Sequence, residues 1–144
     1  MSDLTAAPTS PTDSRAPSNA DVPPSEIIYS RYASHLEPSL LPAIRSLISA
    51  DLSEPYSIYV YRYFLYQWGD LCFLASHNDT IIGVVIAKLE AHRGGPQLRG
   101  YIAMLAVKSQ YRGRRIATKL VSMAIDAMVE RGADEVSYCL PTPP

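Results

Sequence analysis

A buried strand, a basic turn and an amphipathic helix follow one another over residues 99–131, and this order restricts the chain to few folds. The segment RGYIAMLAV reads as a buried strand. Apolar residues after the turn recur on one helical face until Gly132, a residue type that ends helices. The apolar helix positions are Ile116, Leu120, Ala124, Ile125 and Met128. We therefore predict an α/β fold in which this strand leads directly into this helix.

The turn between that strand and that helix has the chemistry of a phosphate site. Free N–H groups and the positive dipole end of a helix attract anions. Arg112, Arg114 and Arg115 can add charge-assisted contacts to such an anion. A solvated basic surface is an equally ordinary reading of the same residues. The run RGRR also fits a nuclear address or a nucleic-acid contact, so three uses stay open at this point.

Short strands and helices account for the rest of the periodic sequence. A hairpin is expected around the turn His77-Asn78-Asp79. Ser39 is the expected N-cap of the first helix, with Pro42 in its first turn. The tyrosine-rich second helix has a strand as its rival by propensity alone. The predicted strands are 26–32, 71–76, 80–90, 99–107 and 134–140, and the predicted helices are 39–51, 57–67 and 116–131.

Composition indicates one globular domain behind a polar tail. Of the 144 residues 47% are hydrophobic, which excludes a wholly disordered chain. No apolar run reaches about 18 residues, so we expect no membrane span, and the N-terminus does not resemble a signal peptide. Residues 1–25 are rich in Ser, Thr, Ala and Pro and are predicted to be a disordered tail, with the domain over 26–144.

Charge and cysteine content limit the partners. The net charge of −1 argues against wholesale nucleic-acid binding. Cys72 and Cys139 cannot make a metal site by themselves and suggest a reducing compartment. Cys72 lies in an apolar strand and is expected in the core. His35, His77 and His92 lack ligand-like spacing and read as surface or loop residues.

Residues 111–117, Tyr-Arg-Gly-Arg-Arg-Ile-Ala, align with the acetyl-CoA signature Arg/Gln-x-x-Gly-x-Gly/Ala from Arg112 to Ala117. Together with the order of elements, this motif resembles the GNAT acetyltransferase superfamily. Three segments are more specific, and they resemble the catalytic subunits of NatC-type N-terminal acetyltransferases over about residues 28–135. These segments are DLSEPYSIYVYRYFL, LRGYIAMLAV with the preceding His92-Arg93 pair, and YRG with IATKLV.

The resemblance implies a GNAT fold, which is a mixed, mainly antiparallel sheet flanked by helices. It also implies transfer of acetyl from acetyl-CoA, without a metal, to the α-amino group of proteins that begin with Met and a bulky hydrophobic residue. The implied partners are nascent N-termini, auxiliary NatC-type subunits and the ribosome, in the cytoplasm, with neither direct nucleic-acid nor membrane contact. Acetylation of another amine, such as a lysine, and a nucleic-acid module that stacks bases on tyrosines are the rival readings.

The family pattern also assigns site residues. Backbone N–H groups of the strand are expected to bind the acetyl and pantetheine part, with Leu105 best placed to stabilise the oxyanion. Glu54 is expected to bind the amine or take its proton, and Tyr101 to hold the peptide backbone or an ordered water. The implied peptide-binding residues are Leu52, Glu54, Pro55, Tyr56 and Tyr101. The implied cofactor residues are Met104, Leu105, Ala106, Val107, Arg112, Gly113, Arg114, Arg115, Ile116 and Ala117.

Two features depart from the family pattern. Arg115 occupies the internal glycine of the signature, where glycine carries no Cβ and no φ restriction. After Gly132-Ala133-Asp134-Glu135 the sequence VSYCLPTPP no longer fits. Since Val136-Ser137 can be encoded as GTGAGT, a splice-donor sequence, we expect translated intron or a truncated gene there. A fragment without its C-terminal strands and helix is expected to have an unpaired sheet edge and low stability. An inactive fragment that binds only CoA or partner subunits is therefore a further rival to the acetyltransferase reading.

Overall fold

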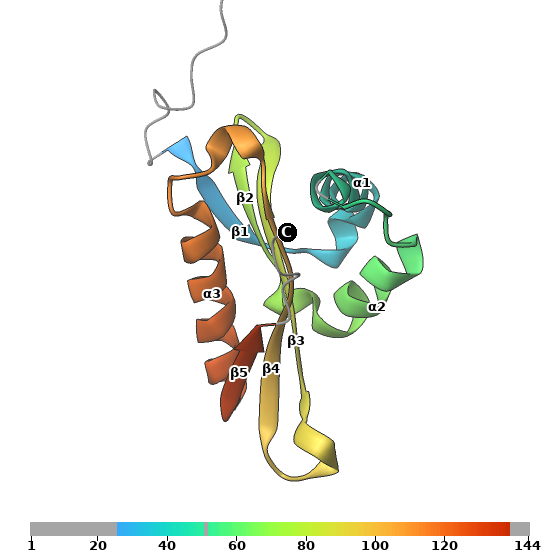
Figure 1. The fold of residues 1–144 in the computed structure, drawn as a ribbon, viewed down its shortest axis with the longest axis vertical. Coiled ribbons are helices and arrows are strands. Elements are labelled where there is room, and N and C mark those ends of the chain that lie inside the picture. Colours follow the sequence, from blue (N-terminus) through green and yellow to red (C-terminus); the bar gives the residue numbers. More distant parts are fainter. Residues whose placement is uncertain (1–25, 51, 139–144) are drawn as a thin grey trace, which may run out of the picture.

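A five-stranded sheet in the order β1-β2-β3-β4-β5 separates two layers of helices in this computed structural model (Figure 1). Helices α1 and α2 cover one face, and α3 covers the other. The structure describes residues 26–50 and 52–138, so the predicted tail over 1–25 lies outside the described residues. The strands are β1 Ile28–Arg31, β2 Phe73–His77, β3 Thr80–Ala91, β4 Leu98–Val107 and β5 Glu135–Tyr138. The helices are α1 Glu37–Ser49, α2 Ile58–Trp68 and α3 Ile116–Glu130.

Both faces of the sheet are apolar, because the central strands are covered on each side. Val84 and Ile86 of β3 pack with α1 and α2, whereas Val85 packs with α3. Cys72 is fully buried in the core on the α1 side, as predicted, although it lies just before β2 and not in the strand expected from residue 71. The predicted strand over 99–107 and the predicted helix over 116–131 are confirmed as β4 and α3.

The hairpin between β2 and β3 turns on two residues in the left-handed region. Asn78 has φ of 51° and Asp79 has φ of 64°, and His77 pairs with Thr80 across them. Positive φ at both central positions matches the twist of the flanking strands, and Asn and Asp tolerate it. The predicted turn is confirmed.

The second helix is confirmed, but the predicted N-cap of the first helix is wrong. Ser57 caps α2, and its Oγ accepts a hydrogen bond from the Tyr59 N–H at 3.2 Å, so the rival strand is wrong. Ser39 does not cap α1: the N-cap is Leu36, and Ser39 Oγ donates to its carbonyl at 3.1 Å. Pro38, in the first turn of α1, favours this earlier start. The shift leaves Pro42 inside the helix instead of in its first turn.

The last strand meets the sheet over only part of its neighbour. β5 pairs in parallel with β4 from Arg99 to Ile102. From Ala103 to Val107, no strand of the described residues lies on that side of β4, and none pairs the outer edge of β5. Backbone groups of alternate β4 residues point toward that side. Within the described ranges no helix is long and apolar enough to cross a membrane.

Candidate functional site

The connection from β4 to α3 places two residues in the left-handed region. Gly113 has φ of 85°, and Arg115, the N-cap of α3, has φ of 61° and ψ of 23°. The Arg115 carbonyl accepts the first bond of the helix, from the Lys119 N–H at 3.0 Å. The N–H groups of the preceding first turn have no acceptor within the helix, so they form its positive end. Such a chain reversal makes a concave site for an anion.

A cavity of about 310 Å³ lies at this helix end. Its lining joins the end of β4, the turn and the first turn of α3, and it exposes the backbone of the turn. The predicted cofactor residues around it are Val107, Arg112, Gly113, Arg115, Ile116 and Ala117, and Tyr111 and Thr118 complete the lining. The structure therefore brings together the two ends of the predicted signature.

The three arginines of the turn are held differently. Arg112 Nε donates to the Val107 carbonyl at 3.3 Å, which keeps this side chain at the mouth of the cavity. Arg114 lies over the ring of Tyr111, with its guanidinium carbon 6.0 Å from the ring centroid, and it does not line the cavity. Arg115 is exposed and lines the cavity. Two cations thus face the cavity, and a third stacks beside it.

The β4 residues of the predicted site turn their side chains into the cores. Met104 and Ala106 are buried toward α1 and α2, and Val107 is buried toward α3. Leu105 is half-buried and packs on the α3 side. The backbone of this segment is therefore the part that is open to a ligand. The family resemblance implied binding through the same backbone groups.

Tyr101 lies in β4 between two cations. Its ring centroid is 5.1 Å from Lys88 Nζ and 5.6 Å from the guanidinium carbon of Arg99. The hydrogen bond from Lys88 to Glu90, 2.9 Å long, raises the pKa of Lys88 and keeps it cationic. Arg99 is likewise paired with a carboxylate, that of Glu135 at 3.1 Å, so Tyr101 has a polar surrounding at the place where β5 runs alongside β4.

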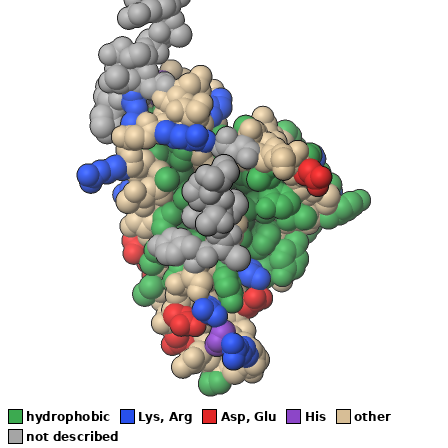
Figure 2. Space-filling view, in the orientation of Figure 1, with side chains coloured by type: hydrophobic (Ala, Val, Ile, Leu, Met, Phe, Trp, Pro, Cys, Tyr) green, Lys and Arg blue, Asp and Glu red, His purple; other side chains and the backbone are tan. Residues whose placement is uncertain are grey.

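The predicted peptide-binding loop follows α1, and part of it lines a cavity together with residues of α1. Leu52 packs against the core, and Pro55 and Tyr56 line a cavity of about 250 Å³. The ring of Tyr56 meets that of Tyr61 edge to face, with centroids 6.1 Å apart. The remaining lining residues are Pro42, Arg45, Ser46, Ser49 and Tyr61. In Figure 2, hydrophobic side chains gather on the side of the molecule where α1 and α2 lie.

Glu54 itself is exposed, and within the described residues it forms no hydrogen bond or ion pair. No described interaction joins Glu54 to Tyr101 or Leu105, the two predicted catalytic residues of β4. The predicted cofactor residues that the structure gathers around one turn are Val107, Arg112, Gly113, Arg115, Ile116 and Ala117.

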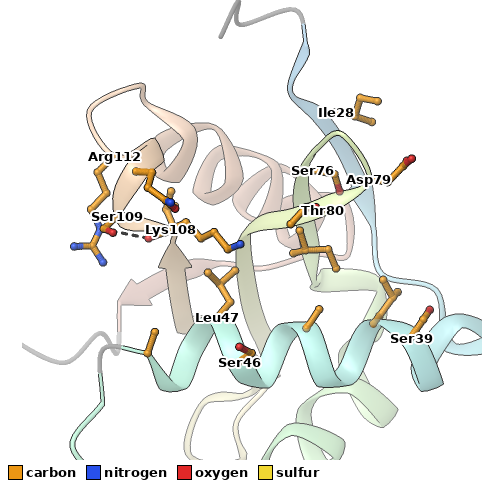
Figure 3. Close-up of a pocket in the computed structure, with 16 residues that line it drawn as sticks. Ile28, Ser39, Ser46, Leu47, Ser76, Asp79, Thr80, Lys108, Ser109 and Arg112 are labelled. Carbon is orange, nitrogen blue, oxygen red and sulfur yellow. Dashed lines mark hydrogen bonds between the residues drawn. The ribbon is translucent and has the colours of Figure 1, made fainter. Parts of the chain in front are cut away.

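A larger groove of about 740 Å³ was not predicted from the sequence (Figure 3). It lies between α1 and the β2–β3 hairpin, and it shares Val107 and Arg112 with the cavity at the start of α3. Lys108 and Arg112 line one end, and Ser76, Asp79 and Thr80 line another part. No local pattern marks these residues as a site, because they come from separate parts of the sequence and meet only in the fold.

His77 was also misread from the sequence. It ends β2 and its side chain is only 11% exposed, rather than lying free on a surface loop. Its Nδ1 is 2.7 Å from the Tyr111 hydroxyl, and its Nε2 is 3.3 Å from Glu26 Oε2. Both partners are far away in sequence, so no local pattern signals the contact.

Residues 41–143 match the model of the acetyltransferase (GNAT) family. N-alpha-acetyltransferase 30 of Homo sapiens is 51% identical over 125 residues, which cover 85% of this chain and 33% of the human protein. N-alpha-acetyltransferase 30 of Schizosaccharomyces pombe is 57% identical over 93 residues, covering 65% of this chain and 61% of that protein. A crystal structure of the NatC complex bound to Gag peptide and CoA contains a chain with 48% identity and a TM-score of 0.73. That match covers 78% of this chain and 73% of the other.

The chain spans between about one third and three fifths of the length of these curated relatives. Within the described residues, no group of three or more His, Cys, Asp or Glu side chains could hold a metal ion. The family match covers most of the chain, and the fold has the sheet and helices expected of that family. The chain belongs to the GNAT acetyltransferase family.

Proposed function

We propose that the chain binds acetyl-CoA and transfers its acetyl group to the α-amino group of proteins that begin with Met and a bulky hydrophobic residue. The observation that carries this proposal is the turn from β4 to α3. There a cavity of about 310 Å³ combines the open N–H groups of a helix end with Arg112 and Arg115. A diphosphate has the charge and the acceptor oxygens that these groups require.

The residues around this turn fit CoA in a second respect. Next to the cavity, β4 is paired with β3 on one side, but on its β5 side it has no strand partner from Ala103 to Val107 among the described residues. Amide groups of the pantetheine chain can pair with such a backbone edge as a short strand does. When bound, acetyl-CoA supplies an activated acyl group as a thioester. The chain supplies backbone N–H groups near Leu105, where negative charge develops on the carbonyl oxygen.

The acceptor amine requires little activation, but it must be held in position. An α-amino group has a pKa near 8, so part of it is already neutral at pH 7. Correct positioning against the acyl carbon then contributes much of the rate. We assign Glu54 to bind the amine or accept its proton, and Tyr101 to hold the peptide backbone. The Lys88–Glu90 and Arg99–Glu135 ion pairs beside Tyr101 give this position a polar surrounding that suits a peptide backbone.

Selection of the first residues is assigned to the loop after α1. Leu52 and Tyr56 offer apolar surface for a Met side chain, and Pro55 restricts the shape of the loop. The relatives named N-alpha-acetyltransferase 30, at about half identity, support this substrate class. By the same resemblance we propose auxiliary subunits as partners and nascent chains in the cytoplasm, at the ribosome, as substrates.

Transfer of labelled acetyl from acetyl-CoA to synthetic peptides tests the proposal. We expect a Met-Leu peptide to be labelled at its N-terminus, and a matched peptide with a blocked N-terminus and an internal lysine to stay unlabelled. Preferential labelling of lysine would overturn the substrate assignment. Binding of CoA without transfer to either peptide would favour the second candidate, a CoA-binding subunit without catalysis.

A further inference from the structure

His77 connects the hairpin at one end of the sheet to the turn at the start of α3. Its Nδ1 lies 2.7 Å from the Tyr111 hydroxyl, and the two rings meet edge to face with centroids 5.6 Å apart. Its Nε2 lies 3.3 Å from a carboxylate oxygen of Glu26, just before β1. The imidazole is thus held from both sides and is almost fully covered, with 11% of the side chain exposed.

The two partners decide which nitrogen of the neutral imidazole carries the hydrogen. A carboxylate only accepts hydrogen bonds, so Nε2–H must donate to Glu26. Nδ1 is then the acceptor, and the Tyr111 hydroxyl donates to it. Glu26 therefore fixes the tautomer that His77 offers to Tyr111.

Tyr111 in turn belongs to the anion cavity. It lines that cavity together with Arg112 and Arg115. Its ring also supports the Arg114 guanidinium, and its backbone N–H donates to the Lys108 carbonyl at 2.8 Å. A hydroxyl anchored on the sheet therefore restrains the turn that the family uses for phosphate.

We infer that His77 is a positioning residue for CoA binding, which holds the β4–α3 turn in its anion-binding form through Tyr111. This inference rests on the proposed function, because it takes the turn to be the CoA diphosphate site. His77 acts on that site through Tyr111 and does not itself line the cavity.

The test measures binding of dephospho-CoA to the full chain by calorimetry at pH 8. This probe keeps the diphosphate, which is the group that the turn is proposed to bind. His77→Leu and Tyr111→Phe are each expected to weaken binding about five-fold at pH 8, with no further loss in the double variant. His77→Gln keeps a hydrogen-bonding side chain and is expected to bind nearly as the wild type does at pH 8.

Rescue by the conservative variant separates positioning of Tyr111 from a merely structural role. Leu fills the space of His77 without a hydrogen bond to Tyr111, whereas Gln restores a hydrogen-bonding group. His35→Gln, at an exposed position in a different turn, is the matched control and should keep the wild-type affinity. Thermal unfolding of each variant verifies that it is folded.

Two results would overturn the inference while leaving the proposed function intact. One is unchanged affinity in both His77→Leu and Tyr111→Phe; the other is a loss of affinity in His77→Gln as large as that in His77→Leu. Absence of any CoA binding by the wild-type chain would instead overturn the proposed function, and this inference with it.

Discussion

The Lys119 N–H donates to the Arg115 carbonyl at 3.0 Å, so helix α3 begins at a residue whose φ is 61°. This is the left-handed region, in which a Cβ crowds the following carbonyl. The signature glycine of the family has no Cβ, and this chain adopts the conformation that suits glycine with an arginine in place. The departure found in the sequence therefore costs conformational energy and does not remove the turn.

Arg115→Gly is expected to raise the free energy of unfolding by about 1 kcal/mol, because it relieves this strain. Arg114→Gly is the matched control: it also removes one cation from the turn, but Arg114 does not have positive φ. Denaturant unfolding of both variants measures the difference. An equal loss of stability in the two variants would contradict the account of Arg115.

Glu54→Gln tests the assignment of the exposed loop carboxylate. If Glu54 binds the amine or takes its proton, turnover of a Met-Leu peptide should fall about 10²-fold. Affinity for acetyl-CoA should stay unchanged, because the cavity at α3 does not include Glu54. Steady-state kinetics and calorimetry measure the two effects. Glu130→Gln, at an exposed position at the end of α3, should match the wild type in both.

Gly100→Ala is expected to destabilise the fold by about 1–3 kcal/mol, because a core without space does not accept an added methyl group. A Cβ at Gly100 would run into the sulfur of Met128, which is fully buried under β4. Met128→Ala creates the missing space but leaves a cavity by itself. In the double variant the two losses, measured by urea unfolding, should sum to less than their separate values. Strict additivity would mean that the two positions do not meet.

Burial raises the pKa of the Cys72 thiol far above its usual value, because the side chain has no access to water. In the unfolded chain a thiol ionises near pH 8.5. The folded chain then keeps a proton that the unfolded chain loses, so stability is full below pH 8.5 and falls as the pH rises. The expected slope is about 1.4 kcal/mol per pH unit between pH 9 and 10.

Cys72→Ala removes this ionisation and serves as the control for the pH dependence. Its free energy of unfolding should be lower at pH 7, because the substitution removes a buried sulfur atom from the core. That free energy should fall less steeply from pH 8.5 to 10. Burial also raises the pKa of Tyr32 and Tyr61, which steepens the fall above pH 10 in both proteins alike. Parallel curves would show that Cys72 ionises within the folded chain.

Local sequence patterns were enough to predict the parts of the fold that depend on near neighbours. Apolar spacing and Gly132 defined α3, and Ser57 marked the start of α2. Ser39 misled the prediction because Pro38 starts α1 earlier. Parallel pairing of β5 with β4 depends on contacts across α3, and a strand pattern alone could indicate only that β5 exists.

The candidate site also contains residues that the sequence could predict and residues that it could not. The signature residues are contiguous, so their assembly at one turn followed from the sequence. His77 could not be recognised, because its partners are 34 and 51 residues away. The separate direction of Arg114 depends on the ring of Tyr111, and neither its stacking nor the groove beside α1 has a local sequence signal.

Thermal unfolding of the full chain with increasing acetyl-CoA tests the central claim most directly, since it asks whether the turn at Arg115 binds the cofactor. A ligand that binds only the folded chain stabilises it by about 2.7 kcal/mol at 100 times its Kd. We predict one cooperative transition whose midpoint rises steadily with acetyl-CoA, and rises less for Arg112→Ser. A midpoint that does not respond to acetyl-CoA, or the lack of a cooperative transition, would contradict the claim.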